Sequence, residues 1–343
     1  MNVSSRRHGL DTLVSVEQAA VDPEVASLVA RGWHIGESIG DEKTMQKLRD
    51  ADNEFDVREL ERKYTLKHLE KTIQGTDGNS IILSIYRPMK PDVLSKRPGI
   101  YYIHGGGMTF GNLFYGLSTV LPVVRDNRAV CVTVEYRLAP EHRAPAALND
   151  CYDGLKWVGE HLDELGIDEN KLLIVGRSAG GALAAGTALL LRDKNEGPKL
   201  CGMMLNSPML DDRSNTESSW FFKHSLYWTR KSNIFAWRQV LGENYDSANV
   251  SPYVAPARAT NLSCLPPTFI DVGDMELLLD EATEFAEKLR NAGVEVELRR
   301  WERVFHCYDI MAPEVRKEIL KARFEWINTM ISTTLRHYYL LGI

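Results

Sequence analysis

The sequence has few of the features that mark secreted, membrane-spanning or nucleic-acid-binding proteins. Only five of the 343 residues are cysteines, and no two of them have Cys-x-x-Cys spacing, which argues against a disulfide framework and favours a reducing compartment. No apolar run is long enough to span a membrane, and residues 1–24 contain no signal-peptide core. The net charge of −6 is typical of a protein without a basic surface for nucleic acid. These absences predict a cytoplasmic protein that binds neither membranes nor nucleic acids.

What is present is a succession of apolar runs separated by helical patterns. Alternating runs at 63–73 and 80–88 flank the turn sequence Gly-Thr-Asp-Gly-Asn, which predicts a hairpin. Near-continuous apolar runs that alternate with helices are typical of the α/β class, in which a mostly parallel sheet is covered by helices on both faces. The predicted strands of this sheet are 98–105, 129–136, 171–176, 201–207, 267–273 and 294–301.

Two segments interrupt this pattern and are the candidate cap. Residues 1–60 are polar and helix-prone, and residues 208–250 form an aromatic-rich insertion between two predicted strands. A long insertion in a compact domain is usually a lid or a binding loop. We therefore expect a helical cap made of 1–60 and 208–250 over a catalytic domain made of 61–207 and 251–343.

The central motif is Gly176-Arg177-Ser178-Ala179-Gly180, which follows one predicted strand and precedes a helical pattern. This is the G-x-S-x-G sequence in its strand–turn–helix context. The glycines permit a tight turn that exposes the serine hydroxyl, and the helix points its free N–H groups toward charge that develops at a reacting carbonyl. The motif predicts Ser178 as a nucleophile; a chance glycine–serine turn is the alternative.

A second motif, His104-Gly105-Gly106-Gly107, lies at the end of the first strand of the predicted parallel sheet. A run of glycines lets backbone amides approach a substrate oxygen, as in the HGGG loops that stabilise the oxyanion in lipases and esterases. A phosphate-binding loop is the alternative, but neither G-x-G-x-x-G nor G-x-x-x-x-G-K-[ST] fits these residues. His104 itself is predicted to orient the loop.

A nucleophilic serine needs a histidine base and a carboxylate that fixes its tautomer. Three histidines follow Ser178 in the chain, namely His224, His306 and His337. His306 lies directly after the last predicted strand, where the α/β-hydrolase fold presents its base, because the chain order in this fold is serine, acid, histidine. His224 precedes every acid candidate, and His337 follows the last predicted helix, so His306 is the predicted base.

The acid is expected in the turn after the strand at 267–273. Asp274 and Glu276 both fit, and their spacing alone does not separate them. Asp271 falls inside the strand, whereas Asp280 and Glu281 fit the start of the next helix, where the helix dipole stabilises negative charge.

Together these motifs resemble the hormone-sensitive-lipase-like family of α/β-hydrolases, which is known for its HGGG and GDSAG sequences. The resemblance extends from about residue 77 to the end of the chain. It includes VEYRLAPEHRAPAALND at 134–150, SPMLDDR at 207–213 and SPYVAPARA at 251–259. These segments, together with the two motifs and in the family's order, make the match highly specific.

Carried over residue by residue, the resemblance implies Ser178 as nucleophile and His306 as base. It implies an oxyanion hole formed by the amides of the HGGG glycines Gly105, Gly106 and Gly107, chiefly the last two, and by Ala179. The family's D-P-L-x-D pattern matches 276–280, which makes Glu276 the acid and leaves Asp274 as the reserve.

The sequence departs from the family pattern at two positions beside these residues. Arg177 stands where the family often has aspartate, which alters the charge at the nucleophile turn. The histidine segment reads Phe-His-Cys-Tyr-Asp where Phe-His-Gly-Phe is commoner, so Cys307 is expected to make the activity sensitive to thiol reagents.

The implied reaction is two-step acyl transfer that hydrolyses a small carboxylic ester, and family members with a cap of this size act on short to medium acyl chains. Most aromatic residues of 220–237 are expected to pack the cap, and one or two are expected to line the substrate pocket. The candidates are Trp220, Phe221, Tyr227 and Trp228.

Rival hypotheses keep the same fold. An amidase, an arylformamidase or a lactonase uses the same triad, and a non-catalytic small-molecule receptor is disfavoured because Ser178 and His306 are both present. The sequence has no His-Glu-x-x-His or paired-ligand spacing, so we expect neither a metal nor another cofactor. The edge strand at 294–301 is a candidate contact for a homodimer.

Overall fold

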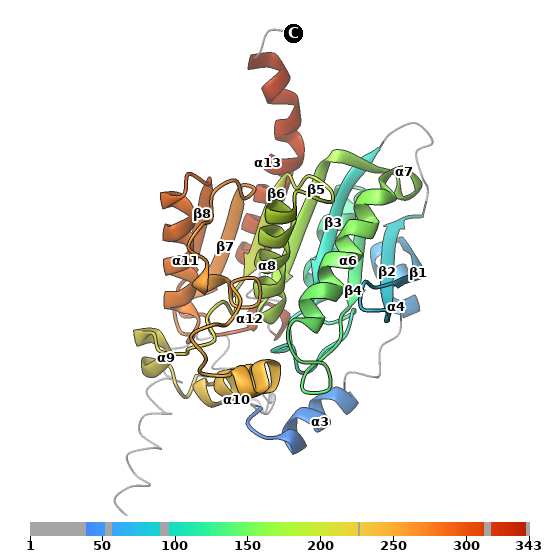
Figure 1. Ribbon diagram of the computed structural model, residues 1–343. Helices are drawn as coiled ribbons and strands as arrows, with labels where there is room; N and C mark the ends of the chain where they lie inside the picture. The colour runs from blue at the N-terminus through green and yellow to red at the C-terminus, as the bar shows by residue number, and fades with distance from the viewer. Residues whose placement is uncertain (1–38, 52–56, 90–95, 226, 312–316, 341–343) are drawn as a thin grey trace, which may run out of the picture.

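One eight-stranded sheet forms the centre of the protein (Figure 1). It is described in a computed structural model that covers residues 39–51, 57–89, 96–225, 227–311 and 317–340. The strand order is β1-β2-β4-β3-β5-β6-β7-β8. The strands are β1 Leu66–Gln74, β2 Ser80–Pro88, β3 Arg97–Ile103, β4 Val130–Glu135, β5 Ile167–Arg177, β6 Gly202–Asn206, β7 Thr268–Gly273 and β8 Val296–Trp301.

The sheet is parallel except at one edge. The strands β1 and β2 form the predicted hairpin, and β2 also runs antiparallel to β4. All other neighbouring strands pair in parallel, which confirms the predicted α/β class. The strand β5 begins at Ile167 rather than at the predicted Lys171, because Ile167 pairs with Arg97 across an irregularity in the register. The polar residues that follow Ile167 concealed this extension in the sequence.

Helices cover both faces of the sheet (Figure 1). Along β3, Tyr101 and Ile103 belong to the core packed by α6, α8 and α11, whereas Ile100 and Tyr102 belong to the core packed by α5 and α13. Within the described residues, no helix combines the length and the apolar character that a membrane crossing requires. The helices are α3 Glu42–Ala51, α4 Val57–Tyr64, α5 Leu121–Asp126, α6 Ala146–Glu160, α7 Leu162–Leu165, α8 Ala179–Lys194, α9 Glu217–Phe221, α10 Arg230–Leu241, α11 Leu279–Asn291, α12 Tyr308–Met311 and α13 Lys317–Leu340.

The helices α3, α9 and α10 lie together beyond one end of the strands (Figure 1). Arg49 of α3 donates hydrogen bonds of 2.7 Å to the carbonyl oxygens of Thr109 and Ala139. Ser218 of α9 donates a hydrogen bond of 2.9 Å to the carbonyl oxygen of Leu277. These bonds attach α3 to the loops that follow β3 and β4, and α9 to the loop that follows β7.

The predicted division into a cap and a catalytic domain stays a prediction. Residues 1–38 and 52–56 of the expected cap lie outside the described residues. The described part of the 208–250 insertion contains α9 and α10, each with a threonine N-cap whose hydroxyl accepts a hydrogen bond from a backbone amide.

Candidate active site

Ser178 occupies the sharp turn between β5 and α8. Its backbone angles, φ 52° and ψ −119°, fall in a strained region for a residue with a side chain. Two backbone hydrogen bonds hold this geometry: the amide of Ser178 donates to Asn206 at 2.8 Å, and its carbonyl accepts from Met209 at 3.0 Å. Gly180 must lack a side chain, because a Cβ atom there would lie 2.2 Å from the carbonyl oxygen of Ile103. The predicted turn therefore has both the strain and the close packing that its glycines allow.

Three side chains from distant parts of the sequence meet at this turn. The Nε2 atom of His306 lies 2.9 Å from Ser178 Oγ. On the other side of the ring, Nδ1 of His306 forms a hydrogen bond with Oε2 of Glu276. The exposed fractions of Ser178, His306 and Glu276 are 3%, 1% and 0%, so the three side chains have almost no contact with bulk water. The structure thus brings together the three side chains that the family resemblance implies.

The two candidate acids occupy different environments. Glu276 is buried, and its Oε1 atom accepts hydrogen bonds of 2.8 Å from Ser207 Oγ and from the amide of Gly273. Asp274 instead accepts a hydrogen bond of 2.6 Å from the amide of Arg303. The amide of Asp274 donates to the carbonyl oxygen of Trp301 at 3.0 Å, next to the paired ends of β7 and β8. The carboxylate that meets His306 is therefore that of Glu276.

The environment of His306 changes the basicity of its ring. Burial by itself lowers the pKa of His306, but the adjacent Cys307 and Glu276 outweigh burial and raise the pKa above the ordinary value. His306 also affects the neighbouring thiol. Burial raises the pKa of Cys307, but His306 and Arg177 outweigh burial and lower this pKa below its ordinary value. The ring is consequently a stronger base than an isolated histidine.

His104 supports the glycine loop in the way that its position predicted. Its ring stacks on Tyr136 at 4.1 Å between centroids, and its Nδ1–H donates a hydrogen bond of 2.8 Å to the carbonyl oxygen of Gly105. The hydroxyl of Tyr136 donates to the carbonyl oxygen of His104 at 3.0 Å. Because burial lowers the pKa of His104 to about 3, the ring is neutral at physiological pH and acts as a fixed hydrogen-bond donor.

The glycine loop lies directly against the serine. A Cβ atom built on Gly105 would lie 3.3 Å from Cβ of Ser178. Gly106 has φ +105°, and a Cβ atom there would lie 2.0 Å from the carbonyl oxygen of Phe110, so only glycine fits. Among the described residues, the amides of Gly106 and Gly107 donate none of the backbone hydrogen bonds that occur outside helices and strands. Ala179 is the first residue of α8, and its N–H has no intrahelical partner.

Two of the four candidate pocket residues lie near this centre. Trp228 is buried; its ring centroid lies 6.1 Å from that of His306, and a Cβ atom on Gly107 would lie 2.7 Å from the ring. Tyr227 shares a hydrogen bond of 2.5 Å with the hydroxyl of Tyr115. Through these side chains the insertion contacts Gly107 of the glycine loop and Tyr115, which follows that loop.

The other two candidates lie at the surface. Trp220 is 56% exposed and Phe221 is 71% exposed. The guanidinium carbon of Arg230 lies over the Trp220 ring, 3.6 Å from the ring centroid. Trp220 also lines a cavity with residues of α10. Of the four candidates, only Tyr227 and Trp228 are thus placed near the glycine loop, and the expectation that one or two of the four line the substrate pocket stays a prediction.

Sequence reasoning missed two aromatic residues beside the centre. The ring centroid of Phe110 lies 6.5 Å from that of Trp228 and 6.0 Å from that of Tyr115. Both Phe110 and Tyr115 follow the HGGG motif within the segment Met-Thr-Phe-Gly-Asn-Leu-Phe-Tyr. Their closeness in sequence to the predicted oxyanion loop is the signal that could have identified them.

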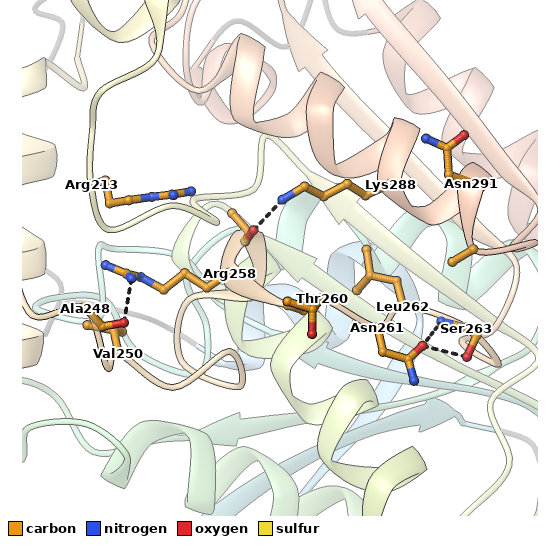
Figure 2. A pocket seen from close by; sticks show the side chains of 13 residues that line it. Arg213, Ala248, Val250, Arg258, Thr260, Asn261, Leu262, Ser263, Lys288 and Asn291 are labelled. Atoms are coloured by element: carbon orange, nitrogen blue, oxygen red, sulfur yellow. Dashed lines mark hydrogen bonds between the residues drawn. The ribbon is translucent and has the colours of Figure 1, made fainter.

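A wide cavity of about 810 Å³ lies elsewhere, between the 248–263 segment and α11 (Figure 2). None of Ser178, His306 and Glu276 lines it. Its cationic groups already have partners: Arg213 pairs with Asp211, Arg258 pairs with Asp212, and Lys288 donates to the carbonyl oxygen of Ala257 at 2.7 Å. Across the described ranges, no group of three His, Cys, Asp or Glu side chains is arranged to hold a metal ion.

Known proteins resemble this chain in sequence and in fold. The sequence profile of a family described as the alpha/beta hydrolase fold matches residues 100–310. The esterase LipI of Mycobacterium tuberculosis is 31% identical over 293 residues, which cover 85% of this chain and 89% of that protein. The carboxylesterase NlhH of the same species is 34% identical over 251 residues, 70% of this chain and 75% of that protein. The solved structure of a bacterial heroin esterase is 32% identical, has a TM-score of 0.81, and is matched over 91% of this chain and 98% of that one.

Fold, site and relatives together define the class of this protein, which is a carboxylic ester hydrolase with the α/β-hydrolase fold. Within that class, the chain belongs to the hormone-sensitive-lipase-like family, as its HGGG and G-x-S-x-G motifs predicted.

Proposed function

We propose that this enzyme hydrolyses small carboxylic esters with short to medium acyl chains by two-step acyl transfer through Ser178, His306 and Glu276. The observation that supports this mechanism is the unbroken series of contacts from Ser178 Oγ to His306 Nε2, and from His306 Nδ1 to Glu276. A serine next to a base whose tautomer is fixed by a carboxylate is the arrangement that activates a hydroxyl as a nucleophile.

In the first step, His306 Nε2 takes the proton of Ser178 as Oγ attacks the ester carbonyl carbon. The carbonyl oxygen becomes an oxyanion, which accepts hydrogen bonds from the amides of Gly106, Gly107 and Ala179, with Gly105 supporting the loop. When the tetrahedral intermediate collapses, the protonated His306 gives its proton to the leaving alkoxide. An alcohol departs, and the acyl group remains on Oγ.

In the second step, water replaces the alcohol. His306 removes a proton from the water as its oxygen attacks the acyl carbonyl carbon, and the same amides hold the second oxyanion. The proton then passes from His306 to Ser178 Oγ, which releases the carboxylic acid and restores the enzyme. Glu276 keeps Nδ1 protonated throughout and stabilises the imidazolium that forms in both steps.

The preference for short to medium acyl chains is supported by the aromatic side chains around the centre. Trp228 lies against Gly107 and His306, and its indole N–H donates to Asn233 Oδ1 at 3.0 Å, which fixes the ring. Asn233 belongs to α10 and donates in turn to Ser214 Oγ at 2.8 Å. A ring held by two successive hydrogen bonds limits the space beside the serine, and we propose that the insertion acts as the cap over this space.

The test is a panel of p-nitrophenyl esters, from acetate to dodecanoate, with matched anilide and lactone substrates. The wild type should turn over the short and medium esters with the highest kcat/KM, and Ser178→Ala should retain less than about 10⁻³ of that rate. Faster turnover of the anilide or the lactone than of every ester would favour an amidase or a lactonase instead.

A second set of variants addresses the acyl chain. Trp228→Ala should raise kcat/KM for decanoate relative to acetate by about tenfold, since one or two added methylenes in an apolar pocket change binding by this order. Trp220→Ala, which alters an exposed tryptophan of the same insertion, is the matched control and should leave the chain-length profile unchanged. An unchanged profile in Trp228→Ala would refute the proposed limit on chain length.

A further inference from the structure

Arg177, one of the two departures from the family pattern, forms an ion pair with the segment that carries His306. Arg177, the last residue of β5, donates from Nη1 to Asp309 Oδ2 at 2.7 Å, and its Nη2 contacts Asp309 Oδ1. The exposed fractions of Arg177 and Asp309 are 3% and 4%. Arg177 immediately precedes Ser178, and Asp309 follows His306 by three positions in α12. One buried, bidentate ion pair therefore joins the segment of the nucleophile to the segment of the base.

The pair belongs to a longer buried series of charges. Asp309 also contacts Nη1 of Arg323 in α13. Arg323 in turn donates to both carboxylate oxygens of Asp271 in β7, at 2.7 and 3.1 Å. Asp271 accepts further hydrogen bonds from Asn206 at 2.9 Å and from Trp301 at 3.1 Å. Two guanidinium groups and two carboxylates thus alternate, with no net charge, across β5, α12, α13 and β7.

Such an arrangement is weak evidence for stability, whereas its bidentate contacts restrict the relative positions of the groups that they join. Taking charges out of water is expensive, and an apolar replacement of a whole buried pair is often neutral, whereas removal of one partner is strongly unfavourable. An aspartate at position 177, as the family often has, would place two carboxylates side by side. The arginine at 177 therefore depends on the carboxylate at 309, and both belong to the active-site segments.

The segment that carries His306 is attached at both ends. Before the histidine, Val304 accepts from the amide of Met275 at 3.1 Å, and the amide of Arg303 donates to Asp274 Oδ1 at 2.6 Å. After the histidine, the side chain of Asp309 contacts Arg177 and Arg323. Between them, Cys307 has φ 61°, a left-handed conformation that favours glycine and is strained for cysteine. A strained segment keeps its shape only when its ends are held.

We propose that Arg177 and Asp309 are positioning residues, whose ion pair holds the His306 segment against the end of β5 so that the imidazole stays within reach of Ser178. The inference rests on the proposed function of Ser178 and His306. It assigns to position 177 a role in the reaction geometry that the aspartate common in the family could not have beside Asp309. It also assigns to Asp274, the reserve acid, a role in holding the other end of the segment.

The test is a double-mutant cycle with Arg177→Met, Asp309→Asn and the combined variant. A displacement of about 1 Å in a catalytic group can lower a rate about 10²-fold, so each single variant should lose kcat by about that factor with KM changed less than about threefold. The combined variant should lose no more than the worse single variant, because the two residues act as one unit. Arg177→Lys keeps the charge but loses the bidentate fork, and it should fold normally and lose kcat by about tenfold.

Arg258→Met is the matched control, because it breaks an arginine–carboxylate pair with a buried Asp212 that lies at the open cavity. It should lower the melting temperature while kcat stays within about twofold. If Arg177→Lys and both single variants behave like this control, the pair has a merely structural role and the inference is overturned. Losses of kcat that multiply in the combined variant would overturn it as well.

The proposed function fails by a different result. If Ser178→Ala kept wild-type turnover, the assignment of Ser178 as the nucleophile would be wrong. If Ser178→Ala is inactive while Arg177→Lys turns over ester at the wild-type rate, only the positioning role is lost.

Discussion

The proposed catalytic centre and the wide cavity are two polar regions of the same protein that differ in burial and in the use of their hydrogen-bond donors. At the centre, Ser178, His306 and Glu276 are almost completely buried, and the amides of Gly106 and Gly107 donate none of the backbone hydrogen bonds outside helices and strands in the described chain. At the cavity, the space is wide, and each cationic side chain is already satisfied by a carboxylate or a carbonyl oxygen. A reactive site needs donors that are held in place and not yet used. The proposed catalytic centre meets this requirement, and the cavity does not.

The largest expected effect is that of replacing Glu276, the proposed acid of the catalytic centre. Glu276→Gln should lower kcat by about 10⁴-fold, because an amide favours the wrong tautomer of His306 and cannot stabilise the imidazolium. Asp274→Asn, two residues away, should lower kcat by less than about threefold, since the carboxamide oxygen still accepts from the amide of Arg303. Steady-state kinetics on p-nitrophenyl acetate measure both, and the reverse order would assign the acid to Asp274.

The glycine loop should show the next largest effect. A methyl group at Gly106 would lie 2.0 Å from the carbonyl oxygen of Phe110, so Gly106→Ala must displace the loop. Losing one oxyanion donor lowers kcat by about 10²–10³-fold. Gly78→Ala is the matched control, since Gly78 also has a positive φ but has open space around it; it should affect the melting temperature and not kcat. Equal kinetics in the two variants would remove the loop from the mechanism.

A smaller effect is expected in the dependence of activity on pH. The reaction needs neutral His306, so a raised pKa of His306 moves the acidic limb of kcat/KM above about pH 6.5, the ordinary value. Cys307→Ala removes one of the groups that raise this pKa, and the limb should move to lower pH. Cys264→Ala, which alters an exposed cysteine, is the control. A limb that stays in place in Cys307→Ala would show that the thiol does not influence the base.

The smallest effect is expected at the open cavity. Lys288→Met removes a cation from its wall and a hydrogen bond to Ala257, and kcat/KM should stay within about twofold of the wild type because no reacting group lies there. A tenfold loss in steady-state assays on small esters would break the distinction between the two regions.

The contacts that the sequence could predict are those that are encoded by short motifs. The motifs around Ser178 and Gly106 predicted the turn and the loop, and the chain order predicted His306. Asp274 and Glu276 could not be separated from the residues alone, because both lie in the turn after β7 and the folded path of that turn decides which carboxylate reaches His306. Only the family pattern favoured Glu276. The β5 extension at Ile167 was missed because polar residues interrupt its apolar pattern.

Local sequence patterns could not predict contacts between residues that are far apart in the chain. Arg177 and Asp309 are 132 positions apart. The sequence identified Arg177 as a departure from the family pattern but did not indicate its partner. The exposure of Trp220 and Phe221 was equally hidden, because an aromatic-rich segment has the same composition whether its rings face a pocket or the solvent.

The most direct test of the central claim is reaction with a fluorophosphonate, followed by mass spectrometry of the peptides. The account predicts a single phosphonylated residue, Ser178, with loss of ester turnover in proportion to labelling and no labelling of Ser178→Ala. An enzyme that hydrolyses esters while Ser178 stays unlabelled, or that carries the phosphonyl group on another residue, would contradict it.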